Sequence, residues 1–157
     1  MDATDLTHLR RCVDLAREAL DDGDEPFGSL IVSAAGDVLF EDRNRVAGGD
    51  QTRHPEFEIA RWAAANMSPE ERADAVVYTS GEHCPMCSAA HAWVGLGRIV
   101  YAVSSSQLVE WRGQFGAAPS PVAVLPAQAI APGVKVEGPE PSLQARMHDL
   151  HYRASRR

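Results

Sequence analysis

Two short motifs constrain this chain more than any other feature. His54-Pro55-Glu56 and, further along, Cys84-Pro85-Met86-Cys87 together supply one imidazole, two thiols and one carboxylate. Imidazole nitrogen and thiolate sulfur suit zinc better than magnesium or calcium, which prefer oxygen ligands. A structural zinc site is closed by four protein ligands, whereas a catalytic site keeps three and leaves one position for water. The sequence therefore predicts a fold that brings His54, Cys84 and Cys87 together around a catalytic zinc ion.

Glu56 supplies the remaining chemistry. It stands two residues after His54, too near to share the ion easily but within reach of a metal-bound water. Zinc lowers the pKa of such a water toward about 7, and a glutamate beside it can take the proton and return it to a leaving nitrogen. The H-x-E and C-x-x-C pattern is typical of zinc-dependent nucleobase deaminases. We therefore expect hydrolytic removal of an amino group.

The two cysteines are spaced for a helix N-terminus. Cys84 and Cys87 lie three apart around Pro85, and proline is favoured in the first turn of a helix. The positive end of that helix favours thiolate, which is the form that binds metal. A redox pair of the thioredoxin type is the alternative, but it leaves the motif around His54 unexplained.

Length and charge exclude several classes of protein. The chain has 157 residues, of which 45% are hydrophobic, and a chain of this size buries about 70% of its unfolded surface in one core. We predict a single domain over residues 1–157. The formal net charge of -7 repels phosphate groups, so we expect no nucleic-acid partner.

The cysteine count and the hydropathy indicate the compartment. No apolar run approaches the roughly 18 residues of a membrane span, and the acidic start lacks the basic region of a signal peptide. Three cysteines, two of them in a C-x-x-C motif, fit a reducing compartment better than a disulfide framework. We expect a cytoplasmic protein without membrane contact.

Hydrophobic periodicity predicts alternating helices and strands. Helices are expected at about 5–21, 56–67, 85–94 and 141–153, and strands at 30–32, 38–40, 75–79, 99–103 and, briefly, 122–124. The strand, helix and strand between 75 and 103 imply a parallel pair with a right-handed crossover. The pattern is typical of an α/β fold.

Five segments, in this order, resemble the cytidine deaminase superfamily, and most of all its guanine deaminase and free-nucleobase branch, which includes s-triazine deaminases. The resemblance covers Leu6 to Val103. It is carried by Pro26-Phe27-Gly28-Ser29-Leu30-Ile31-Val32, Asn44, His54-Pro55-Glu56, Glu82-His83-Cys84-Pro85-Met86-Cys87 and Gly97-Arg98-Ile99-Val100-Tyr101.

The resemblance implies a three-layer α-β-α fold with a five-stranded mixed sheet, usually assembled as a homodimer. It also implies that the C-terminal segment 117–157 is a lid or is exchanged between subunits. By the same resemblance His54, Cys84 and Cys87 hold zinc and Glu56 shuttles protons.

Substrate-binding residues follow from the resemblance and from position. Asn44 is expected to bond the base and Phe27 to pack near its ring. Glu82 and Glu110 are the candidate acids for reading amino or ring N–H groups, Trp111 is a candidate wall of the site, and Tyr152 belongs to the candidate lid.

The chain departs from the family at two positions. Pro55 has no N–H, so it cannot make the contact to a ring carbonyl that the family commonly makes there. His83 stands where proline usually precedes the first cysteine, and we expect a loop residue with a backbone or solvent role.

The function indicated is a hydrolase that releases ammonia from a small free heterocycle. Guanine is the first candidate, with isocytosine, 5-azacytosine and ammeline-type triazines as others. A tRNA adenosine deaminase and a non-catalytic zinc-stabilised binding module are the alternatives.

Overall fold

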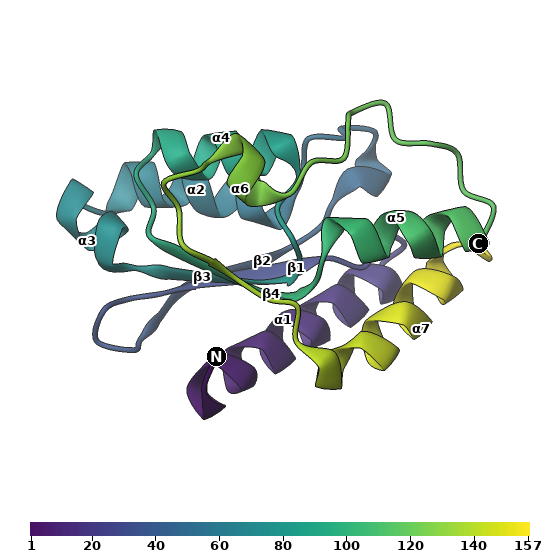
Figure 1. The fold of residues 1–157 in the computed structure, drawn as a ribbon, viewed down its shortest axis with the longest axis horizontal. Coiled ribbons are helices and arrows are strands. Elements are labelled where there is room, and N and C mark those ends of the chain that lie inside the picture. The colour runs from purple at the N-terminus through teal and green to yellow at the C-terminus, as the bar shows by residue number, and fades with distance from the viewer.

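A computed structural model describes residues 1–157 as three layers, with a central sheet between two layers of helices (Figure 1). The sheet has the strand order β2-β1-β3-β4-β5, formed by β1 Gly28–Val32, β2 Val38–Arg43, β3 Val76–Gly81, β4 Arg98–Val103 and β5 Val136–Glu137. The helices are α1 Ala3–Asp21, α2 Pro55–Asn66, α3 Pro69–Asp74, α4 Pro85–Trp93, α5 Ser105–Gln114, α6 Ala127–Ile130 and α7 Gln144–Ala154, with short 3-10 turns η1 Val46–Gly48 and η2 Pro141–Leu143. The expected α/β fold with a five-stranded mixed sheet is confirmed.

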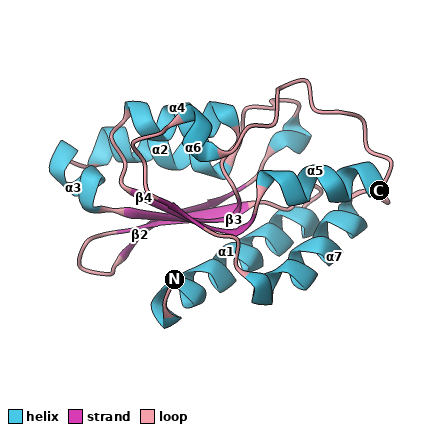
Figure 2. Cartoon of the chain, viewed as in Figure 1, coloured by secondary structure: helices cyan, strands magenta, loops and turns pink.

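One face of the sheet is covered by α1 and α7, with α5 packed against α7 (Figure 2). The helix α1 begins at a capping box, in which Asp2 and Asp5 satisfy each other's backbone N–H groups. Its apolar stripe lies directly on β1, so closely that a Cβ on Gly28 would lie 2.3 Å from Leu15 Cβ. Glycine at this position therefore allows the first strand to approach the helix.

The opposite face carries α2, α3, α4 and α6. Its core is a smaller apolar cluster, centred on Ile31 and Val77 from the sheet and Ile59 from α2. The helices α2 and α4 contact each other, and each begins with a proline. This side of the sheet therefore brings two helix N-termini close together.

The strand pairing places the functional segments at one end of the sheet. The hairpin β1-β2 is antiparallel, β1 also pairs antiparallel with β3, and Ser29 faces Thr79 in that register. The strands β3 and β4 run parallel, with α4 crossing between them, as predicted. Since α4 leaves from the C-terminal end of β3, its N-terminus lies at that edge, where α/β sheets commonly bind ligands.

The last third of the chain differs from the sequence prediction. The prediction of a short strand at 122–124 is wrong, because this segment is exposed and pairs with no strand of the sheet. The fifth strand is Val136–Glu137, which pairs parallel with Ile99 and Val100 of β4. The helices α3, α5 and α6 were not predicted, whereas the final helix was.

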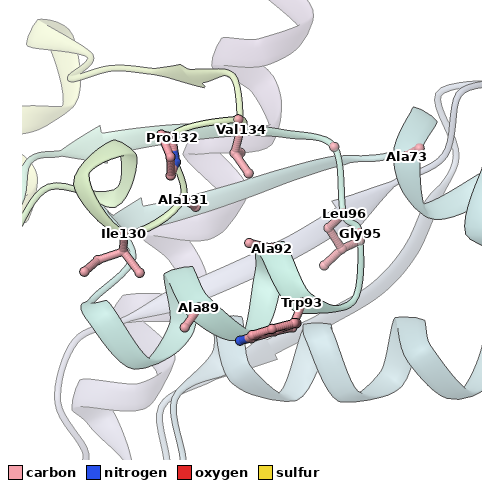
Figure 3. Close-up of a pocket in the computed structure, with 12 residues that line it drawn as sticks. Ala73, Ala89, Ala92, Trp93, Gly95, Leu96, Ile130, Ala131, Pro132 and Val134 are labelled. Atoms are coloured by element: carbon pink, nitrogen blue, oxygen red, sulfur yellow. The ribbon is translucent and has the colours of Figure 1, made fainter.

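Two surface hollows lie away from the motifs that carry His54, Cys84 and Cys87. The first, of about 570 Å³, lies between α4 and the segment 130–134, beside Trp93, whose side chain is 89% exposed (Figure 3). The second, of about 420 Å³, lies near Trp62 and Leu39. Neither contains His54, Cys84 or Cys87. No helix combines the length and apolar character needed to cross a bilayer.

Candidate zinc centre and active site

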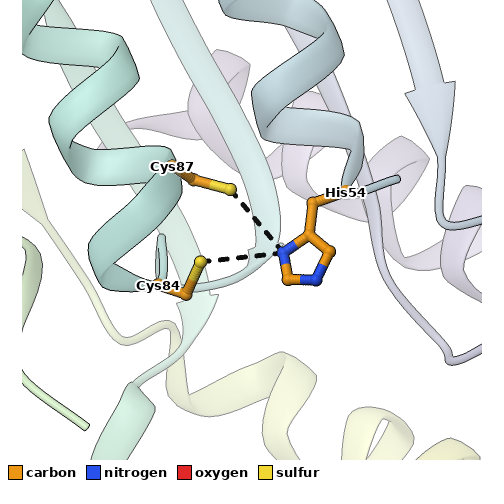
Figure 4. Close-up of side chains that lie close together, drawn as sticks. All are labelled: His54, Cys84 and Cys87. Atoms are coloured by element: carbon orange, nitrogen blue, oxygen red, sulfur yellow. Dashed lines mark hydrogen bonds between the residues drawn. The ribbon is translucent and has the colours of Figure 1, made fainter. Parts of the chain in front are cut away.

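His54, Cys84 and Cys87 converge at the N-termini of α2 and α4 (Figure 4). His54 is the N-cap of α2, Cys84 is the N-cap of α4, and Cys87 lies in the first turn of α4. Their ligand atoms all lie within 4.8 Å of one another, and His54 Nδ1 lies 3.6 Å from the Sγ atom of each cysteine. The three predicted ligands are therefore brought together.

This spacing fits a tetrahedral zinc ion. With zinc bonds of about 2.3 Å to sulfur and about 2.0–2.1 Å to nitrogen, a tetrahedral nitrogen and sulfur lie roughly 3.6 Å apart. The observed separations of 3.6 Å match that edge. One imidazole and two thiolates form a donor set that zinc accepts, with a fourth position left for solvent or substrate.

The charges around the three ligands favour metal binding. Cys84 has its pKa lowered to about 4, chiefly by the hydrogen bond from the Cys87 thiol and in part by His54. The pKa of Cys87 is raised well above its ordinary value, because it supplies the proton that Cys84 accepts and is buried. The thiolate of Cys84 also raises the pKa of His54. Binding of a metal ion by both sulfurs would therefore release the proton that Cys87 holds.

Glu56 lies beside the metal ligands in the first turn of α2. It is 5% exposed, and its Oε2 atom lies 4.0 Å from Cys87 Sγ. Its other oxygen, Oε1, accepts a hydrogen bond of 2.7 Å from the Thr79 hydroxyl. Burial raises the pKa of Glu56, while His54 and the Thr79 hydrogen bond oppose that rise. A carboxylate with this environment is suited to taking up a proton and giving it back.

Thr79 and Ser29 are residues that the sequence interpretation missed. The Ser29 hydroxyl donates to Thr79 Oγ1 at 2.8 Å, so the two neighbouring strands form a polar chain that ends at Glu56. Both side chains are fully buried. Their signal in the sequence is that a hydroxyl interrupts an otherwise apolar strand, and the strand register pairs them.

Asn44 and Phe27 lie together at the end of the hairpin. Asn44 is 1% exposed and follows β2 directly. Its backbone N–H donates to the carbonyl of Phe27 at 3.0 Å, and its side-chain oxygen accepts from Val46 N. The side-chain Nδ2 has no partner, which is uncommon for a buried donor and leaves it available to a ligand. The Phe27 ring packs against Gly81, where a Cβ would lie 2.9 Å from Phe27 Cε1.

The two predicted acids have different surroundings. Glu82 is 9% exposed, and its two oxygens accept from Ser105 N at 2.8 Å and Ala127 N at 2.9 Å. This carboxylate clamps the starts of α5 and α6 to the loop that carries the cysteines. Glu110 is exposed on α5, where it accepts from Gln114. The roles of Glu82 and Glu110 in substrate binding stay predictions.

Trp111 and Tyr152 belong to an aromatic and imidazole cluster between α5 and α7. The Trp111 ring lies edge-on to His148 at 5.1 Å, and Tyr152, which is 44% exposed, lies 5.4 Å from Phe115. The cluster reaches the hairpin through His151, whose ring centroid is 5.1 Å from that of Phe27. In this chain α7 packs on its own α1, and exchange of segment 117–157 between subunits stays a prediction.

His83 is in the expected loop but is not in solvent. It is 1% exposed, and its ring lies edge-on to His91 with centroids 5.2 Å apart. Burial lowers the pKa of His83 well below its ordinary value. Its carbonyl accepts from the Ser88 hydroxyl at 3.2 Å, so the backbone part of the expectation holds and the solvent part is wrong. Pro55 is buried as the first residue of α2.

Known proteins resemble both the sequence and the fold. Residues 2–103 match the family model described as the cytidine and deoxycytidylate deaminase zinc-binding region. A probable cytosine deaminase of Schizosaccharomyces pombe is 34% identical over 115 residues, which is 73% of this chain and 70% of the relative. Guanine deaminase of Bacillus subtilis is 35% identical over 106 residues, 66% of this chain and 67% of the relative.

Solved structures share the architecture. A structure of guanine deaminase from Nitrosomonas europaea has a TM-score of 0.71 at 18% identity, covering 96% of this chain and 84% of that chain. The guanine deaminase structure from Bacillus subtilis has a TM-score of 0.59 at 28% identity, covering 84% and 91%. With the zinc-type ligand set in place, the chain belongs to the cytidine and deoxycytidylate deaminase family.

Proposed function

We propose that this chain hydrolyses the amino group from a small free heterocycle and releases ammonia. The supporting observation is the placement of Glu56, which is buried against the His54, Cys84 and Cys87 cluster and held there by Thr79. Membership of a deaminase family supports the reaction class. A non-catalytic zinc module would have no use for a buried carboxylate at this position.

Each residue of the site has a separate role in the proposed reaction. His54, Cys84 and Cys87 would hold a zinc ion, which would supply an activated water when bound. Glu56 would take one proton of the attacking water to the ring nitrogen beside the amine-bearing carbon, and would then carry the proton of the newly added hydroxyl to the departing amine. A carbon–oxygen bond forms, the carbon–nitrogen bond breaks, and ammonia and a keto product leave. Asn44, through its unpartnered Nδ2, orients the heterocycle.

Guanine is the first candidate substrate, and isocytosine, 5-azacytosine and ammeline-type triazines present a similar edge. The similarity to guanine deaminase of Bacillus subtilis supports this choice. The similarity to a probable cytosine deaminase makes cytosine the substrate to test against it.

The assembly and location belong to the same proposal. We expect a cytoplasmic homodimer, and the three free thiols, Cys12, Cys84 and Cys87, are consistent with a reducing compartment. The net charge of -7 favours a small neutral substrate over tRNA. Light scattering during size-exclusion chromatography measures the subunit number.

Ammonia release over a panel of guanine, isocytosine, cytosine and ammeline tests the function. We expect zinc-loaded protein to release ammonia from at least one base, and Glu56→Ala to lower kcat by at least about 100-fold through loss of the proton carrier. Glu58→Ala on the same helix is the matched control, because Glu58 pairs with Arg53 outside the cluster. Turnover retained in Glu56→Ala contradicts the mechanism.

A further inference from the structure

One tryptophan of the chain lies almost entirely in solvent. Trp93, the last residue of α4, is 89% exposed, whereas Trp62 and Trp111 are half-buried. Tryptophan is enriched in protein interfaces, because its large apolar ring is removed from water there. Trp93 therefore indicates a contact surface on the helical layer that contains α2, α3, α4 and α6.

The hollow beside Trp93 is as apolar as the ring. It has a volume of about 570 Å³, with Ala89 and Ala92 of α4 on one side and Pro132 and Val134 on the other (Figure 3). None of its 12 lining residues carries a charge, although charged residues make up 24% of the chain. The centres of protein interfaces are depleted in charged residues in the same way.

The ring and the hollow lie on one face, which makes that face self-complementary. In a twofold dimer the same patch occurs on both partners, and every contact occurs twice. A second copy therefore brings both a tryptophan for the hollow of the first copy and a hollow for its Trp93. A protein of another sequence would have to supply both features independently.

The charge of the chain also favours this face for self-association. Two copies that each carry a net charge of -7 repel each other over most of their surfaces. The lining of the hollow is uncharged, and charges of both signs follow it in the sequence, with Asp74 after Ala73 and Lys135 after Val134. Contact through this face therefore avoids placing like charges against one another.

The area that a dimer requires is within reach of this face. A stable interface covers about 800 Å² on each partner, which is about a tenth of the 7654 Å² surface of the chain. One tryptophan side chain buries about 150–250 Å². Trp93 alone thus supplies about a fifth to a third of the area needed, and the walls of the hollow add to it.

We propose that Trp93 and the hollow beside it bind a second copy of this chain in an isologous dimer, with the Trp93 ring of each copy inserted into the hollow of the other. The inference concerns a surface and does not depend on the proposed reaction. The helix α4 starts at Cys84 and carries Cys87 in its first turn, so the partner packs against the helix that bears both cysteine ligands.

Two variants test the two halves of the contact. Trp93→Ala removes the ring, and because that ring is 89% exposed it leaves no cavity in the single chain. Gly133→Lys occupies the hollow, and an added Cβ at Gly133 meets nothing within 4 Å. Gly113→Lys on α5 is the matched control, since a Cβ there also meets nothing within 4 Å. Thermal unfolding shows that each variant folds.

Analytical ultracentrifugation over a range of concentrations measures the dimer. We expect a wild-type dimer at about 10 µM, and a dissociation constant at least about 100-fold higher in Trp93→Ala and in Gly133→Lys. The Gly113→Lys control should match the wild type. A wild type that is monomeric at about 100 µM, or a dimer that persists unchanged in either variant, would overturn the proposal.

Mixing the two variants tests the twofold arrangement itself. In a heterodimer of Trp93→Ala with Gly133→Lys, the remaining Trp93 faces the remaining open hollow, and the second contact has neither a ring nor a hollow to fill. We expect native mass spectrometry to find more heterodimer than either homodimer. An absence of heterodimer would contradict the exchange of two equivalent contacts. Ammonia release, measured separately, bears on the proposed function and not on this surface.

Discussion

At the scale of single residues, the site depends on hydroxyl groups that have no catalytic chemistry of their own. Glu56 is buried, and burial alone would favour its protonated form. The Thr79 hydroxyl, itself supported by Ser29, stabilises the ionised form through its 2.7 Å bond. The balance between burial and this hydrogen bond sets how readily the carboxylate takes up a proton.

Replacing Thr79 with valine removes this bond while keeping the volume. The pKa of Glu56 rises further, so at a given pH less of the carboxylate is ionised. We expect kcat/KM to fall about 10-fold near neutral pH, with a larger loss at pH 6 than at pH 8. A pH profile of kcat/KM measures this, and Thr79→Ser should restore most of the activity. An acid limb that stays at the wild-type pH would contradict the assignment.

At the scale of elements, the helices and strands that have a recognisable motif or apolar run in the local sequence were predictable. The helices α2 and α4 each start with a ligand followed by proline, and β1, β3 and β4 each contain a short apolar run. The fifth strand was misplaced because Val136–Glu137 is too short to show a periodicity and forms only through its pairing with β4. The hydrogen bond from Ser29 to Thr79 was missed because its members are 50 positions apart. Contacts of that range depend on the tertiary fold, which local pattern does not encode.

The clamp formed by Glu82 is the element-scale feature that supports the cysteine loop. In Glu82→Gln, an NH2 group replaces one of the oxygens and faces a backbone N–H, so one buried donor loses its acceptor. We expect the free energy of unfolding to fall by about 1–3 kcal/mol and zinc release to a chelator to be faster. Urea unfolding and a colorimetric chelator assay measure the two effects, with the exposed Glu70→Gln as control. Zinc release at the wild-type rate would show that the clamp does not stabilise the loop.

At the scale of the whole molecule, both helical layers bury histidine in its neutral form. His91 in α4 has its pKa lowered to about 4 by burial. His151 in α7 has its pKa lowered to about 3 by burial and by the nearby Arg112 and His148. In the unfolded chain both groups return to their ordinary value of 6.5. The unfolded state therefore binds more protons than the folded state between these limits.

The free energy of unfolding should consequently fall as the pH falls below 6.5. Each of the two histidines contributes a slope of up to about 1.4 kcal/mol per pH unit, down to its own folded pKa. We expect His151→Phe to flatten the dependence by about that amount between pH 6 and 4. Urea unfolding across this pH range measures both slopes. Equal slopes in wild type and His151→Phe would contradict a neutral His151.

The two hydrogen bonds that Glu82 accepts from the starts of α5 and α6 also bear on how homologues can vary in length. Both ends of the stretch from Ser105 to Ala127 bond to one carboxylate, so α5 and the exposed, proline-containing segment after it form a closed loop. The entropy of closing a loop grows only slowly with added residues. Insertions and deletions there are therefore expected to change this surface without displacing Cys84 and Cys87.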